Sequence, residues 1–107
     1  MHHSAAIVIY GRDSSLLALR KLVLEPSGYF VRVTTSAGTL RDYLDDSFVD
    51  LLLLCQTLPT KEANELVKIA HTAWPWTNIL AMQGGRHDAK KLILATWSAL
   101  SMVPKCC

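Results

Sequence analysis

The sequence predicts an α/β domain in which helices cover both faces of a parallel sheet, giving three layers. Short apolar runs alternate with segments whose apolar residues recur at helical spacing. The segment Asp50–Pro59 holds four consecutive leucines, which is typical of a strand buried on both faces. At 107 residues, of which 50% are hydrophobic, the chain is long enough for one domain with a real core.

The first predicted strand is the compact apolar run Ala5–Tyr10, and a helix follows it. Asp13 or Ser14 can cap this helix, because a short side-chain oxygen accepts hydrogen bonds from the free amides of the first turn. Pro26 stops the helix. Arg20 is expected to lie outside its apolar stripe. We expect that stripe to consist of four residues at helical spacing, Leu16, Leu19, Leu22 and Val23.

The middle of the chain contains a predicted edge strand, a weak helix and a stronger one. Tyr29–Thr34 is rich in β-forming residues with partial alternation, which favours an edge strand. Ser36 begins the weak helix, and Asp45–Ser47 ends it. The Leu-rich strand comes next, and Thr60 is expected to cap a third helix that Pro75 closes.

The last third of the chain is expected to add two strands and one helix. Asn78–Met82 is the fourth strand, Asp88 caps the fourth helix, and Leu100–Val103 is a short fifth strand. A strict alternation of strand and helix implies a parallel sheet with right-handed crossovers. Five side chains are expected to be almost fully buried, namely Ile7, Ile9, Leu52, Leu54 and Leu80.

Composition and charge exclude several functions. The net charge is +2 and no block of like charge occurs, so nucleic-acid binding is not expected. No run approaches the length of a membrane helix and no signal peptide is recognised, so no membrane association is expected. Three cysteines, two of them adjacent at Cys106 and Cys107, make no disulfide framework, and a reducing cytoplasm is the simplest setting. His2 and His3 are interpreted as incidental.

The order and spacing of these elements, with the motif Asp-Leu-Leu-Leu-Leu-Cys-Gln-Thr-Leu-Pro at 50–59, resemble the receiver domain of two-component response regulators. The resemblance implies a flavodoxin-like five-stranded parallel sheet of order 2-1-3-4-5 and one receiver-like domain over residues 1–107. It also implies four helices, because the chain ends where the family would add its fifth helix.

The family's chemical positions are mostly altered in this chain. Where the family has a pair of acids that hold magnesium, this chain has Gly11 and Arg12, and Asp13 is the next residue. Where the family has its phosphorylated aspartate, this chain has Cys55. Magnesium prefers hard oxygen ligands, whereas Gly11 has no side chain and Arg12 adds a positive charge. A cysteine cannot form an acyl phosphate. The resemblance therefore implies a degenerate acidic pocket with no bound metal or cofactor and no enzymatic activity.

Two further marker positions follow the fourth and fifth strands. The family's hydroxyl residue falls on Gln83, and its lysine matches Lys105, here interpreted as a remnant of the lost phosphate site. Two functions remain open. One is a pseudo-receiver that acts as a phosphorylation-independent protein-interaction module. The alternative is a thiol-based redox-responsive domain in which Lys105 and Arg12 lower the pKa of Cys55. More often, a cysteine at the end of a core strand is an inert small hydrophobe.

Two candidate interaction surfaces follow from the sequence. The missing fifth helix implies an apolar strip, formed by the first, third and fourth strands beside the first helix. A protein partner, a second copy, or the tail at 104–107 is expected to cover that strip. The cluster Trp74-Pro75-Trp76 is either an exposed partner-binding knob or a cap on the sheet edge.

Overall fold

The described strands form a parallel sheet at the centre of the molecule, in the order 2-1-3-4 when they are numbered along the chain. This computed structural model describes residues 5–55, 58–81, 96 and 98. The strands are β1 (Ala6–Tyr10), β2 (Phe30–Thr34), β3 (Leu51–Leu54) and β4 (Asn78–Ala81). β1 and β3 are interior strands and β2 lies at an edge, as the sequence predicts.

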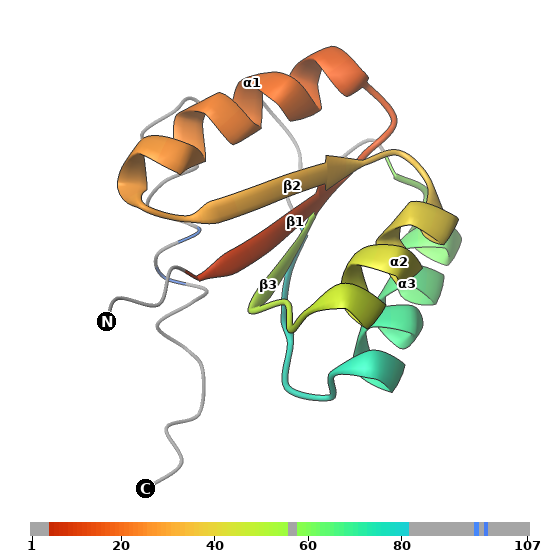
Figure 1. Ribbon diagram of the computed structural model, residues 1–107. Coiled ribbons are helices and arrows are strands. Elements are labelled where there is room, and N and C mark those ends of the chain that lie inside the picture. The colour runs from red at the N-terminus through yellow and green to blue at the C-terminus, as the bar shows by residue number, and fades with distance from the viewer. Residues whose placement is uncertain (1–4, 56–57, 82–95, 97, 99–107) are drawn as a thin grey trace, which may run out of the picture.

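The helices form the two outer layers (Figure 1). α1 (Ser14–Leu24) covers one face of the sheet, and α2 (Ala37–Asp46) and α3 (Thr60–Ala73) cover the other. A 3₁₀ turn at Glu25–Ser27 ends α1, and Gly28 follows it with φ 93°, a left-handed conformation that favours glycine. The three-layer α/β prediction is confirmed.

Alternation along β1 divides the core between the two faces of the sheet. Ile7 and Ile9 point to the α1 side, and Val8 and Tyr10 point to the side of α2 and α3. The four leucines of β3 are divided in the same way and are at most 2% exposed. The continuous apolar run is therefore a strand buried on both faces.

Order and burial agree with the predictions at most positions. The order of the four strands matches the first four of the predicted order 2-1-3-4-5. The described residues contain four strands and three helices rather than five and four, because the predicted helix from Asp88 and strand Leu100–Val103 lie outside them. Leu80 contradicts its predicted burial: it packs against the core but is only partly buried, since β4 pairs only with β3 in the described sheet.

The predicted stripe of α1 is wrong. The helix buries Leu17, Arg20 and Leu24, whereas Leu19 and Leu22 are 60% and 66% exposed. The segment from residue 16 to residue 24 is apolar on nearly all sides, so two different stripes fit its spacing. Packing on the sheet, and not periodicity, selects the stripe that is buried.

The predicted apolar strip beside α1 is not exposed on two of the three strands expected to form it. On this face of the sheet, four side chains of β1 and β3 are at most 1% exposed, namely Ile7, Ile9, Leu51 and Leu53. Leu80 of β4 is partly buried, and what covers this face stays a prediction. The exposed apolar surface lies one layer further out, at Leu19 and Leu22 on the outer face of α1.

Two of the three described helices begin where the sequence predicts, and each has a side-chain cap. The Asp13 carboxylate accepts hydrogen bonds from the amides of Ser15 at 3.0 Å and Leu16 at 3.2 Å, and the Ser36 hydroxyl accepts one from Thr39. Thr60 was expected to cap α3, but it is the first helical residue and no side chain caps that helix.

Side-chain hydrogen bonds also stabilise the edge of the sheet where the strands begin. The backbone amide of Ala6 donates to the Asp50 carboxylate at 2.7 Å, and the Thr77 hydroxyl donates to the Val49 carbonyl at 2.8 Å. The Trp74 indole donates to the Leu44 carbonyl at 2.9 Å and meets the Phe48 ring edge to face. Trp74 therefore caps this edge of the structure, whereas its neighbour Trp76 is 63% exposed.

Candidate functional site

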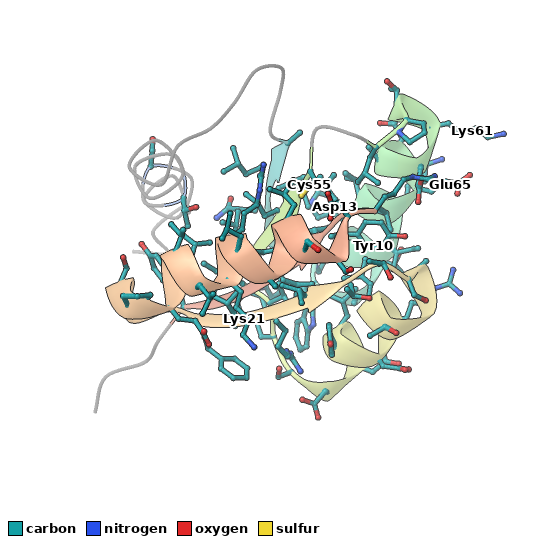
Figure 2. The ribbon with its side chains drawn as sticks, turned by 90° about the horizontal axis from the view of Figure 1, so that it is seen from above. Tyr10, Asp13, Lys21, Cys55, Lys61 and Glu65 are labelled. Carbon is teal, nitrogen blue, oxygen red and sulfur yellow. The ribbon has the colours of Figure 1, made fainter. Side chains whose placement is uncertain are left out.

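The predicted site residues that are described meet where β1 and β3 end. Figure 2 shows Cys55, Asp13 and Tyr10 gathered near the start of α1. The Cys55 amide donates to the Tyr10 carbonyl at 2.9 Å, which extends the pairing of β3 with β1 by one residue. Parallel strands present their carboxyl ends at one edge, and this edge is where α/β sheets place their ligands.

Gly11 packs directly against Cys55. A Cβ atom at position 11 would lie 2.9 Å from the Cys55 Sγ, 3.0 Å from its Cβ and 3.1 Å from Cδ2 of Leu17. Ordinary contacts between carbon atoms are about 3.5–4.0 Å. The space next to Gly11, where the family places an acid, is thus filled by a thiol and a leucine.

Arg12 reaches across this edge to α3. Its guanidinium donates to the Glu62 carboxylate, and the two form an ion pair. The Tyr10 hydroxyl donates to the other carboxylate oxygen of Glu62 at 3.3 Å. Burial, and secondly the negative charge of Glu62, raise the pKa of Tyr10. Sequence analysis missed Glu62, because its distance from Arg12 along the chain leaves no local signal.

Asp13 is used as a helix cap. Its carboxylate oxygen accepts two amide hydrogen bonds at the start of α1, and the residue is exposed. Within residues 5–55 and 58–81, no three His, Cys, Asp or Glu side chains are grouped as metal ligands would be. The three positions predicted as a degenerate acidic pocket therefore have separate structural roles. Gly11 packs against Cys55, Arg12 forms an ion pair with Glu62, and Asp13 caps α1.

The surroundings of Cys55 differ from those that the redox hypothesis requires. The residue is 4% exposed. Burial raises the pKa of its thiol above 9.0; Arg20 opposes this shift and Asp13 adds to it. Arg12, which was expected to lower this pKa, pairs with Glu62 instead, and Lys105 and Gln83 lie outside the described residues. The cation that acts on the thiol is Arg20, on the buried face of α1.

We expect Cys55 to react slowly with Ellman's reagent in the folded protein at pH 8 and quickly in urea. The measurement needs a Cys106→Ser/Cys107→Ser background, so that only Cys55 is counted. Fast labelling of the native protein near neutral pH would contradict the buried, protonated thiol and support the redox hypothesis.

The same raised pKa predicts how stability depends on pH. Above about pH 9, the unfolded chain loses the Cys55 proton that the folded protein retains, so the free energy of unfolding falls as pH rises. Below that pH both states are protonated and this contribution is constant. Cys55→Ala should make the fall above pH 9 shallower, and Tyr10, whose pKa is also raised, should contribute to the fall that remains. Urea unfolding at a series of pH values measures both.

A groove between α2 and α3 lies apart from this edge. Its volume is about 470 Å³, and none of the marker residues lines it. The lining residues are Arg41, Leu44, Asp45, Lys68, Ile69, Thr72 and Ala73. Among the described helices, none is long and apolar enough to cross a membrane.

Comparisons with known proteins identify the fold. No protein-family model and no curated protein matches the chain. Among solved structures, it is similar to a response regulator receiver domain from Methanospirillum hungatei, with a TM-score of 0.66 and 26% identity over 91% of this chain and 76% of that one. It is also similar to the signal receiver domain of an HD domain-containing protein from Pseudomonas fluorescens. The TM-score is 0.77, with 19% identity over 92% of this chain and 96% of that one. A third similar structure is a chemotaxis response regulator of Vibrio cholerae, with a TM-score of 0.75 and 14% identity over 92% of this chain and 99% of that one. The chain has the receiver fold, which confirms the resemblance.

Proposed function

We propose that residues 1–107 form a degenerate receiver domain that acts as a phosphorylation-independent protein-interaction module in cytoplasmic signal transduction, without enzymatic activity. The observation that supports this function best is the contact between Gly11 and Cys55. It replaces an acid and a phosphate acceptor with a close-packed, uncharged pair.

Phosphorylation of a receiver needs a carboxylate acceptor and a metal held by carboxylates. The acceptor position here carries a thiol that burial keeps protonated. A magnesium ion needs several hard oxygen ligands, and the place of the second acid is taken by Arg12, whose charge is paired with Glu62. Restoring one carboxylate would leave the metal ligands missing.

The redox alternative is weaker on the same geometry. A redox-sensing cysteine is accessible and has a lowered pKa. Cys55 is 4% exposed and its pKa is raised. We therefore favour Cys55 as a small core residue that fills the space beside Gly11.

Incubation of the whole protein with acetyl phosphate and Mg²⁺ tests the proposal. Its intact mass is expected to stay unchanged, and the mass of Cys55→Asp is expected to stay unchanged too, because the metal ligands are still missing. A phosphoryl adduct that survives Cys55→Ala would reveal another acceptor, and one lost in Cys55→Ala would reveal a reactive cysteine. Either adduct would overturn phosphorylation independence.

A further inference from the structure

The outer face of α1 carries no charge. Five residues of the helix are exposed, namely Ser14, Ser15, Ala18, Leu19 and Leu22. Its two cations lie elsewhere, since Arg20 is buried and Lys21 is partly buried. Figure 2 looks down on this face, which neither the sheet nor α2 or α3 covers.

The other two helices in the described part of the chain show the ordinary pattern. The exposed residues of α2 include Arg41, Asp42, Asp45 and Asp46, and those of α3 include Lys61, Glu65 and Lys68. A surface helix normally turns its charges to water and its apolar stripe to the core. In α1 the cation Arg20 is buried, whereas Leu19 and Leu22, three residues apart on one face, are exposed. Single exposed leucines need no explanation, but an adjoining pair on a face without charge is typical of a contact surface.

We propose that this face of α1 binds α1 of a second copy of the chain, with the two helices antiparallel about a two-fold axis between residues 18 and 19. The inference deepens the proposed function, because it assigns the interaction surface and its occupant.

Side-chain size fits this arrangement. With the axis between residues 18 and 19, Leu19 faces Ala18 of the second copy, and Leu22 faces Ser15 of the second copy. Each large side chain is thus opposite a small one, and the symmetry repeats both pairs. Alternation of large and small residues lets two helices approach closely. A parallel pair in register would instead place leucine against leucine and serine against serine.

Charge fits the same arrangement. No charged residue lies at the axis, where each side chain would meet its own copy and a charge would repel itself. At the ends, the antiparallel pair brings Lys21, late in the helix, toward Asp13 of the second copy. Glu25, just after the helix, comes toward Arg12 of the second copy, which would join the existing pair with Glu62. Charge pairs at the ends of the contact select the orientation more than they add affinity.

The size of the contact predicts a weak dimer. α1 has 11 residues and is therefore about 16 Å long. One helix pair of this length buries less than the roughly 800 Å² per partner of a standard stable interface. The dimer is therefore expected to form reversibly as the protein concentration rises.

Sedimentation equilibrium over about two decades of concentration tests the inference. The whole protein is expected to shift from monomer to dimer, and Leu19→Glu and Leu22→Glu are each expected to weaken the association at least about tenfold, since each buries an unpaired charge. Trp76→Glu is the matched control, because Trp76 is equally exposed but lies off α1, and it should dimerise normally. Circular dichroism checks that all variants fold.

Cross-linking tests the orientation in a Cys106→Ser/Cys107→Ser background. With a short bifunctional maleimide, Ala18→Cys beside the axis should join two copies, whereas Ser14→Cys near the helix end should not. Cross-linking of both would indicate a parallel pair and overturn the proposed arrangement. A monomer at every concentration would overturn the inference, with α1 left to another protein or to residues 104–107. The acetyl phosphate experiment would then still decide the proposed function separately.

Discussion

Leu53→Ala is expected to lower the free energy of unfolding by about 2–5 kcal/mol. Leu53 has 0% exposure and lies on β3 between Ile9 of β1 and Leu80 of β4 in the sheet register. Truncation to alanine removes a fully buried side chain and leaves a cavity, because the two flanking strands cannot move together. A domain of this size has about 5–15 kcal/mol of stability in all, so the loss is a large fraction.

Leu22→Ala is the matched control for this prediction, since it makes the same chemical change at a side chain that is 66% exposed. Its effect is expected to stay within about 0.5 kcal/mol. Urea unfolding at low concentration, where the proposed dimer is dissociated, measures both variants. Equal losses would contradict the placement of α1, because they would put Leu22 in the core.

The sheet could be predicted because its signals are local and strong. Four consecutive leucines at 51–54 allow little except a strand buried on both faces, and Asp13 and Ser36 mark helix starts through short side-chain oxygens. The alternation of strands and helices then leaves few topologies. Boundaries shifted slightly, as at the start of β1, which is predicted at Ala5 and observed at Ala6.

The orientation of α1 could not be predicted, because its sequence lacks contrast. Two competing apolar stripes can be drawn on this helix. They are formed by its six large apolar residues, namely Leu16, Leu17, Leu19, Leu22, Val23 and Leu24. A charged residue normally settles such a choice by facing water, but Arg20 is on the buried side. The choice depends on how α1 fits the sheet, which involves residues far apart in the sequence.

The sequence predicted where the residues of the candidate site lie, but it did not predict which residues they interact with. Gly11, Arg12 and Cys55 do meet at the end of the strands, because parallel topology fixes where β1 and β3 end. The partner of Arg12 is Glu62, 50 residues away, which no local pattern reveals. The redox alternative expected nearby cations to lower the pKa of Cys55, whereas burial, the largest cause, raises it.

Gly11→Ala is expected to destabilise the protein by about 1–3 kcal/mol, because the added methyl group enters space that Cys55 and Leu17 already fill. The backbone gives no other reason for glycine here, since Gly28 is the residue with positive φ in the described chain. Gly38→Ala is the control. It lies in α2, where the nearest side-chain atom is 3.6 Å away, and alanine should stabilise the helix by about 0.4–1 kcal/mol.

A double-mutant cycle with Cys55→Ala shows whether the contact itself causes the loss. Cys55→Ala removes the Sγ atom that lies 2.9 Å from the added methyl group, so the double variant should be more stable than the sum of the two single changes predicts. Coupling between residues in contact is typically about 0.5–3 kcal/mol. Urea unfolding of the four proteins gives the coupling energy. If Gly11→Ala stabilises as Gly38→Ala does, or if the coupling is zero, the space beside Gly11 is open. A side chain could then enter the pocket, and the main support for a phosphorylation-independent domain would be lost.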